Sequence, residues 1–316
     1  MNFIIVCILK PMIENIYTFL RGMVMGIAEV IPGVSGSTMA LIMGIYDDFI
    51  GFLAEISDFI RSIISFILRK KSFKELKKEF FDIDLKFGAL LGIGMVVALG
   101  IFSHVVSFLM DAYPMYLFAF FFGLVVASMP IPYKEMKKRN IEELILFLLS
   151  FVSFFIILGI NPVEVATNPS PIILFFGGMF AISGMLLPGI SGSFILLLLG
   201  LYGYIINIVS QLTTFSVSAN DLINLMILAL GLTVGFLIVS KILKVLLKSH
   251  HSYLMAFLMA LMGASLRVLW PLNHVGDLTV TTSTLIIASL FCLLGFAIVI
   301  LLQKFTVIDN SNSELL

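Results

Sequence analysis

Charged side chains are scarce in this chain. Of its 316 residues, 12% are charged and 60% are hydrophobic, whereas a soluble globular domain carries about 25% charged residues. This composition excludes an ordinary soluble domain and predicts an all-α polytopic membrane protein. The formal net charge is zero, so the charge balance gives no indication of a nucleic-acid partner.

Cysteine and histidine are also rare. The two cysteines, Cys7 and Cys292, stand near opposite ends of the chain, which excludes a disulfide framework and a cysteine-based metal site. None of the four histidines is paired with a nucleophile or a carboxylate at a recognisable spacing. We therefore expect no enzyme activity, no bound metal and no cofactor.

The N-terminus lacks the features of a cleaved signal peptide. Lys10 and Pro11 interrupt its apolar run, and no small-residue cleavage site follows. We expect residues 1–21 to form an interfacial segment, with translation beginning at Met1 or Met12.

One unusual segment occurs twice. The motif Pro-Gly-Val-Ser-Gly-Ser at residues 32–37 returns as Pro-Gly-Ile-Ser-Gly-Ser at residues 188–193. Around it, residues 22–46 and 178–202 share 10 identities in 25 positions at one offset of 156. A second alignment, of residues 84–128 with 221–265, gives 15 identities in 45 at an offset of 137. The chain is therefore predicted to contain two repeats, at residues 22–160 and 172–302, followed by a tail at 303–316.

Six stretches are long and apolar enough for a membrane crossing, which needs about 20 residues. They are residues 87–110, 114–132, 143–160, 222–240, 252–270 and 281–302. In the first repeat the crossings fall within 87–160 and in the second within 222–302. Residues 52–67 have the spacing of an amphipathic surface helix, within a segment 51–86 that also holds a basic loop.

The basic residues predict the orientation of these crossings. Lys and Arg cluster in the segments 61–86, 134–139 and 241–248, and are absent from 161–171, 203–221 and 271–283. The pattern predicts that both termini are cytoplasmic. It also places each motif segment, 22–50 and 172–203, with both ends on one side of the membrane. We therefore expect two re-entrant helical hairpins in repeats of inverted orientation.

The hairpin turns suggest an anion site. Proline removes a backbone donor and glycine permits unusual conformations, while Ser37 and Ser193 are predicted to cap the returning helices. Helix N-termini attract anions, especially phosphate. The predicted turn residues are Pro32, Gly33, Pro188 and Gly189, and the predicted phosphate-binding residues are Ser35, Gly36, Ser37, Thr38, Ser191, Gly192 and Ser193. The alternative is a kink that only packs tightly.

Three charged residues stand out near these motifs. Glu29 lies in an apolar half-helix where an ionisable group is costly, and its repeat counterpart is Met185. It is a candidate for proton or ion coupling, or alternatively a carboxylate that hydrogen-bonds the loop amides. Arg21 and Arg267 are candidates to bind an anionic headgroup at the inner and outer mouths, or alternatively snorkelling anchors.

The segments 21–46 and 185–194 resemble the two signature blocks of the DUF368 family, and the resemblance extends over about residues 12–302. It implies a PopT-type transporter that moves polyprenyl phosphate, such as undecaprenyl phosphate, from the outer to the inner leaflet for reuse in envelope biogenesis. The resemblance also implies location in the cytoplasmic membrane, with this lipid and membrane lipids as partners. A coupling H+ or Na+ is expected instead from Glu29, because an anion that moves inward against the membrane potential needs a co-transported cation. Family members often have glycine where this chain has Ser37. A small-anion or small-solute secondary transporter fits the same architecture and remains the alternative.

Overall fold

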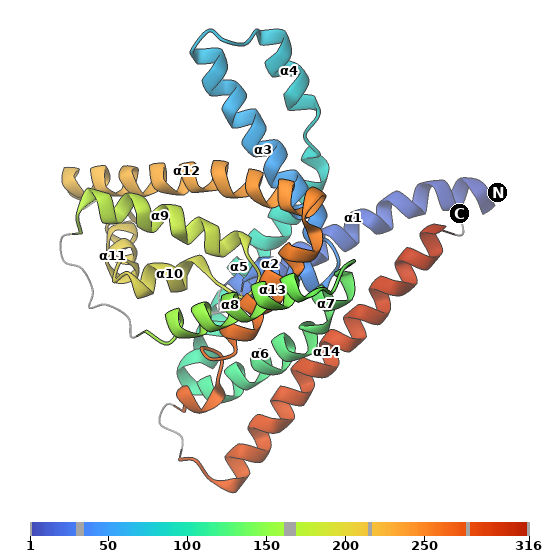
Figure 1. Cartoon of the computed structure of the whole chain (residues 1–316), viewed down its shortest axis with the longest axis vertical. Helices are drawn as coiled ribbons and strands as arrows, with labels where there is room; N and C mark the ends of the chain where they lie inside the picture. Colours follow the sequence, from blue (N-terminus) through green and yellow to red (C-terminus); the bar gives the residue numbers. More distant parts are fainter. Residues whose placement is uncertain (1, 30–34, 161–168, 214–216, 276–278, 315–316) are drawn as a thin grey trace. The chain divides into compact units, whose positions relative to one another are not determined.

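The computed structural model describes residues 2–29, 35–160, 169–213, 217–275 and 279–314 (Figure 1). Every regular element within these ranges is helical, and none is a β-strand. The predicted all-helical fold class is therefore confirmed for the described chain.

The helices group into two compact units, each described by itself. Unit 1 contains α1 (Asn2–Glu29), α2 (Gly36–Ile42), α3 (Tyr46–Ile67), α4 (Phe73–Phe81), α5 (Leu85–Ala112), α6 (Pro114–Ser128), the 3-10 helix η1 (Pro271–Asn273) and α14 (Thr282–Glu314). Unit 2 contains α7 (Pro130–Glu135), α8 (Ile141–Ile157), α9 (Pro171–Leu186), α10 (Gly192–Leu198), α11 (Tyr202–Thr213), α12 (Ala219–Ser249) and α13 (His251–Ser265).

In unit 1, α1 packs against α5 through glycines that bring their backbones together. A methyl group on Gly22 would overlap the backbone of Leu91, and one on Gly94 would overlap the backbone of Phe19. Small residues are the usual means of close helix approach in a membrane, because lipid offers no hydrophobic driving force for association.

In unit 2, α9 and α12 lie side by side and also approach closely at glycines (Figure 1). A methyl group on Gly178 would lie 2.5 Å from the Leu228 carbonyl oxygen, and one on Gly231 would overlap the Phe175 backbone. These pairs are the counterparts of those in unit 1, at offsets of 156 on the first helix and 137 on the second. The duplicated sequences thus form two helix pairs with matching contacts.

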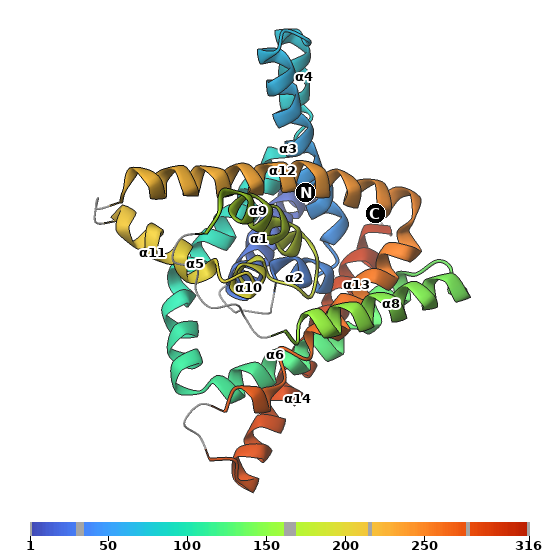
Figure 2. The ribbon, with the colours of Figure 1, turned by 60° about the vertical axis from the view of Figure 1, so that its left-hand side comes forward.

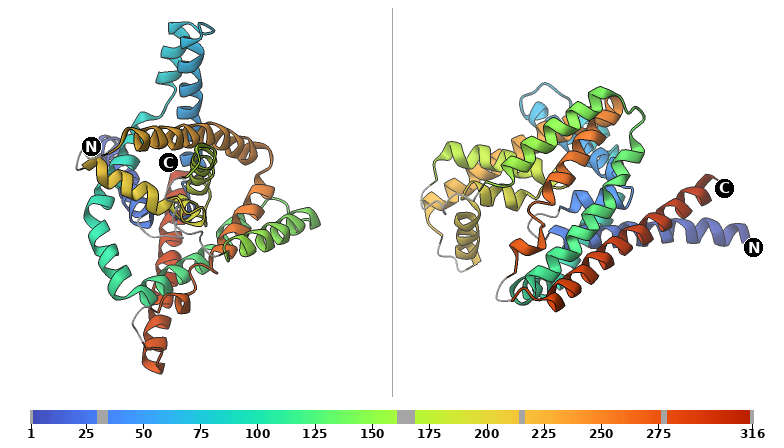
Figure 3. Two further views of the ribbon diagram at one scale, coloured as in Figure 1. Left: turned by 90° about the vertical axis from the view of Figure 1, so that its left-hand side faces the viewer. Right: turned by 60° about the horizontal axis from the view of Figure 1, so that its bottom comes forward.

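The last long helix of each sequence repeat belongs to the compact unit that holds most of the other repeat. Helix α14 pairs with α6, and α8 pairs with α13 (Figure 2, Figure 3). Helix α8 follows the first-half segments but belongs to unit 2, whereas α14 follows the second-half segments but belongs to unit 1. The two compact units therefore do not coincide with the two sequence repeats.

All six predicted crossings are helical, but they differ in length. Among the residues that the structure describes, four apolar segments are long enough to cross a membrane: Leu85–Phe102, Pro114–Glu135, Ala219–Ser249 and Thr282–Leu301. Helix α8 has 17 residues and α13 has 15, which is shorter than the ~20 residues of an average crossing. The prediction of six crossings therefore has the support of helix length at four of them.

Two predicted boundaries fall inside continuous helices. Helix α1 runs through residues 21 and 22 to Glu29, and α14 continues from the apolar stretch into the tail as far as Glu314. The segments 12–21 and 303–314 contain neither glycine nor proline, so no residue there ends a helix.

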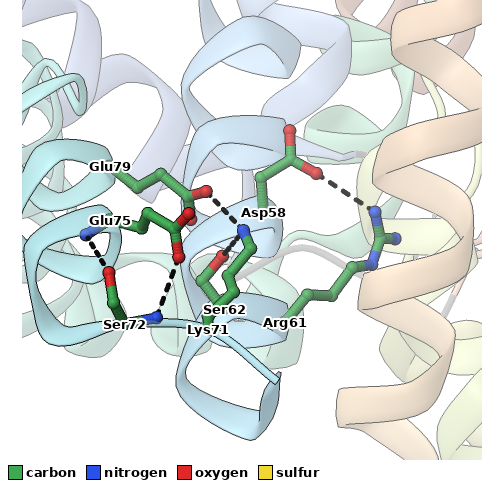
Figure 4. A network of polar contacts seen from close by, with 7 residues as sticks. All are labelled: Asp58, Arg61, Ser62, Lys71, Ser72, Glu75 and Glu79. Atoms are coloured by element: carbon green, nitrogen blue, oxygen red, sulfur yellow. Dashed lines mark hydrogen bonds and ion pairs between the residues drawn. The ribbon is translucent and has the colours of Figure 1, made fainter. Parts of the chain in front are cut away.

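Helices α3 and α4 form a polar hairpin (Figure 4). Residues 52–67, predicted to form an amphipathic surface helix, are helical as part of α3, which begins earlier, at Tyr46; their position at a membrane surface stays a prediction. Ser72 and Glu75 make a reciprocal capping box at the start of α4. Lys71 Nζ lies 2.8 Å from Ser62 Oγ and 2.5 Å from Glu79 Oε1, which ties the connection to both helices.

Candidate functional site

The first motif begins where α1 ends. Pro32 and Gly33 lie outside the described residues, and α2 starts at Gly36. The backbone N–H of Gly36 donates a 2.8 Å hydrogen bond to Oε1 of Glu29, the last residue of α1. The Glu29 carboxylate therefore sits at the first turn of α2, as in the alternative that the sequence left open. Its role in ion coupling stays a prediction.

The second motif makes a buried turn after α9. Gly189 has a φ of +93°, a conformation that disfavours residues with a Cβ atom. A methyl group there would also lie 2.8 Å from the backbone nitrogen of Met262 on α13. Both the backbone conformation and the close contact therefore require glycine at this turn, and Pro188 beside it is buried as well.

After this turn the chain doubles back, because α10 packs along α9 in the opposite direction. The ideal Cβ of Gly184 lies 2.6 Å from Ile195 Cδ1, and that of Gly177 lies 3.5 Å from Leu199 Cδ1. As α10 advances, its neighbours on α9 thus move back toward the start of that helix. The second motif thus connects α9 to a short helix, α10, that packs against it within unit 2.

The two motifs differ at one equivalent position. The ideal Cβ of Gly36 lies 2.8 Å from Glu29 Oε1 and 3.3 Å from the Met25 carbonyl oxygen. That of Gly192 lies 2.6 Å from Met185 Cγ and 2.5 Å from the Ala181 carbonyl oxygen. The thioether side chain of Met185 therefore occupies the place that the carboxylate of Glu29 takes in the first motif.

The predicted cap of α10, Ser193, is wrong by two residues. Ser191 is the N-cap of α10: its backbone is extended, and its Oγ accepts the N–H of Phe194 at 3.2 Å. Ser193 is already helical, with its Oγ 3.1 Å from Ser191 Oγ, and Ser37 is likewise the second residue of α2. A capping residue needs non-helical dihedral angles, and the motif supplies these at its first serine in α10.

The hydroxyl groups of the motifs are withdrawn from the surface. Ser35, Ser37, Thr38 and Ser191 are each at most 1% exposed, and Ser193 is half-buried. Buried hydroxyl groups require hydrogen-bond partners, so these side chains are held in defined positions. This fits both a binding site and a tightly packed turn.

The two arginines contact other parts of the fold. Arg267 Nη1 donates to the carbonyl oxygen of Phe155 at 2.8 Å, and its guanidinium lies 4.7 Å from that ring centre. Because Phe155 is in the last turn of α8, this cation stabilises the helix C-terminus. Arg21 is half-buried on α1, where its charge acts on Asp48 in the first turn of α3.

A polar cluster between α11 and α12 was missed at the sequence level. The hydroxyl of Tyr204 donates to Asp221 Oδ1 at 2.9 Å and accepts from Asn224 Nδ2 at 2.7 Å. Its signal in the sequence was the identity of Asp84 and Asp221 in the second alignment. Within the described ranges, no group of three or more His, Cys, Asp or Glu side chains is placed to hold a metal ion.

Comparison with known proteins gives consistent matches over most of the chain. The model of the VCA0040-like family, described as undecaprenyl phosphate translocase-like, matches residues 25–287. A polyprenyl-phosphate transporter of Vibrio cholerae is 32% identical over 254 residues, which cover 80% of this chain and 77% of the relative. One of Staphylococcus aureus is 26% identical over 262 residues, covering 80% and 85%. No solved structure matches the chain. The resemblance in the sequence is thus confirmed, and the chain belongs to the VCA0040-like family of undecaprenyl phosphate translocase-like proteins.

Proposed function

We propose that this protein transports polyprenyl phosphate, an undecaprenyl-phosphate-like lipid carrier, across the cytoplasmic membrane. The observation that carries the proposal is the family match over residues 25–287, together with two relatives named polyprenyl-phosphate transporters. The proposed direction is from the outer to the inner leaflet, so that the carrier is reused in envelope biogenesis. The distribution of Lys and Arg supports cytoplasmic termini.

The proposed architecture is an inverted repeat in which each half contributes one re-entrant hairpin. The matching glycine contacts of the α1–α5 and α9–α12 pairs support the repeat, and the return of α10 along α9 supports a hairpin. The phosphate would pass through the protein while the isoprenoid tail stays in lipid. Rocking of one repeat against the other would then give alternating access.

The proposed phosphate site consists of the hydroxyl and glycine residues of the two motifs, with Arg21 and Arg267 meeting the headgroup at the mouths. The two motifs would act differently. In the second, Met185 leaves the first turn of α10 without a carboxylate of its own. In the first, the Glu29 carboxylate accepts a hydrogen bond from the Gly36 N–H. A phosphate that approaches this N–H is therefore repelled by the negative charge of the carboxylate.

Glu29 is therefore our proposed coupling residue. Binding of H+ or Na+ to the carboxylate would remove its charge and lower the cost of bringing in the phosphate anion. Inward movement of an anion against the membrane potential costs about 2.3 kcal/mol per charge per 100 mV, and a co-transported cation offsets this cost.

A proteoliposome assay tests the proposed substrate. Fluorescent polyprenyl phosphate is placed in the outer leaflet, and its protection from an impermeant quencher is followed over time. Uptake of radiolabelled inorganic phosphate is measured in parallel, with empty liposomes as the blank. We expect protein-dependent protection of the lipid without phosphate uptake. Phosphate uptake without lipid movement would instead establish the small-anion transporter.

The Gly192→Leu variant tests the proposed site. The ideal Cβ of Gly192 already lies 2.6 Å from Met185, so a larger side chain fills the start of α10. A matched control is Gly51→Leu on α3, because no atom lies within 4 Å of its ideal Cβ. We expect Gly192→Leu to abolish lipid transport in normally inserted protein and Gly51→Leu to retain it. Full activity of Gly192→Leu would remove this motif from the site.

A further inference from the structure

Unit 2 contains an apolar pocket whose lining includes no residue of either motif. The pocket lies where α7, α8 and α13 meet and has a volume of about 350 Å³. This volume is in the range of small-ligand sites. Its apolar lining includes Tyr133, Met136, Leu144, Phe147 and Met259.

The α7–α8 connection, which contributes Arg139 and Asn140 to the pocket lining, is held in place by hydrogen bonds of its backbone. The N–H of Lys138 donates to Ser252 Oγ on α13 at 3.0 Å, and the N–H of Asn140 donates to Glu143 Oε2 at 3.0 Å. The guanidinium of Arg139 lies 4.4 Å from the centre of the Tyr133 ring and donates to the Tyr133 carbonyl oxygen at 3.2 Å. These contacts fix Arg139, which also lines the pocket, beside the apolar ring of Tyr133.

The local charges favour an anionic occupant. In the described part of the chain, Lys134, Lys137 and Lys138 make no ion pair with a carboxylate. The nearby glutamates, by contrast, are engaged. Their partners are Tyr253 for Glu142, His251 for Glu135 and the Asn140 amide for Glu143. Glu143 is the acidic residue of the lining, and it lies in the first turn of α8, where the helix dipole stabilises negative charge.

We propose that this pocket binds an anionic glycerophospholipid. Its phosphate lies at Arg139, which presents several N–H donors in a plane suited to phosphate, and the adjacent lysines add positive charge. The part of one acyl chain nearest the headgroup lies against Leu144, Phe147 and Met259. Basic pockets between the helices of membrane proteins recognise anionic headgroups in this way. The site is separate from the proposed transport function and does not depend on it.

Lipid titration of the full-length protein tests the charge requirement. The probes are dioleoyl phosphatidylglycerol and dioleoyl phosphatidylcholine, with bound lipid counted by native mass spectrometry. Loss of a charge-assisted hydrogen bond corresponds to about a tenfold weaker affinity. We expect this loss for phosphatidylglycerol in Arg139→Gln, with partial retention in Arg139→Lys. The control Lys74→Gln removes a cation from α4 and should leave the affinity unchanged.

A second pair of variants tests the apolar lining. Leu144 and Ile145 are both about half-exposed on α8, but only Leu144 lines the pocket. We expect Leu144→Gln to weaken phosphatidylglycerol binding severalfold and Ile145→Gln to leave it unchanged. This pair and Arg139→Lys carry the test if Arg139→Gln fails to fold.

Three results would overturn the inference. Equal losses in Arg139→Gln and Lys74→Gln would mean that diffuse surface charge attracts the lipid. Equal affinity for phosphatidylcholine would remove the requirement for an anion. Displacement of phosphatidylglycerol by equimolar undecaprenyl phosphate would assign the pocket to the transported lipid. Transport in the proteoliposome assay can fail while the pocket still binds phosphatidylglycerol, so the two proposals are tested separately.

Discussion

Replacement of Glu29 by glutamine tests how the first motif couples transport to an ion. The glutamine side chain keeps an oxygen that can accept the Gly36 amide, but it carries neither charge nor a transferable proton. A hydrogen bond to a charged group is worth about 1.5–3 kcal/mol, and a neutral one about 0.5–1.5 kcal/mol. The 2.8 Å bond between Glu29 and Gly36 is thus replaced by a weaker one, but loss of the charge also removes the cost of burying it. We therefore expect the stability to change by no more than about 1 kcal/mol. The control Glu14→Gln, an exposed carboxylate on the same helix, should change it little.

The effect on transport should be larger. If one proton accompanies each lipid, a gradient of one pH unit supplies about 1.4 kcal/mol and multiplies the accumulation ratio about tenfold. The Glu29→Gln variant should lose this dependence, whereas Glu14→Gln should keep it. If sodium is the coupling ion, the dependence on a sodium gradient should be lost in the same way.

The assay is lipid transport in proteoliposomes with an imposed pH or sodium gradient, beside thermal unfolding in detergent for both variants. The coupling proposal is refuted if Glu29→Gln transports with an unchanged gradient dependence. It is also refuted if the wild-type protein responds to neither gradient. A loss of stability without any change in coupling would leave Glu29 as a helix-capping carboxylate only.

Three other changes test separate features. Met185→Glu should place a carboxylate at the start of α10 and reduce lipid transport at least tenfold, with Met185→Gln as the neutral control; an unchanged rate would contradict the proposed role of the second motif. Gly189→Ala forces a Cβ onto a φ of +93° and to within 2.8 Å of the α13 backbone, so thermal unfolding should show a loss of about 2 kcal/mol or more, whereas Gly51→Ala should show none. The hydrogen bond from Lys71 lowers the pKa of Glu79, so its contribution is complete above the ordinary value of 4.5 and is lost as the pH falls through the lowered value. Glu79→Gln should therefore reduce hydrogen-exchange protection of α4 up to about fivefold at pH 7, with a difference that vanishes in strong acid; a difference independent of pH would be contrary evidence.

The helical fold and the duplication could be predicted because both are written in local patterns. Apolar stretches of sufficient length specify helices in a membrane protein, where each backbone polar group needs an internal partner. The glycines at positions 22, 94, 178 and 231 are identical pairs in the two alignments. In the structure these same residues lie at the contacts of the α1–α5 and α9–α12 pairs.

The caps and the charge contacts were harder to predict. Ser191 and Ser193 both suit the start of α10, and the choice depends on which residue has non-helical dihedral angles. Glu29 was recognised as unusual, but its partner was left open between an ion and a loop amide. The hydrogen bond to Gly36 depends on the path of the chain from α1 to α2, which sequence spacing does not describe.

By itself, the sequence determined the helical membrane class, the duplicated motifs and the family, because composition, periodicity and identity are local properties. Only the tertiary structure decided that α8 pairs with α13 and α14 with α6. All four helices are largely apolar, so hydrophobicity alone allows several pairings. The choice between pairings comes from close packing where the helices touch, as in the contact of Gly123 with the Cys292 backbone.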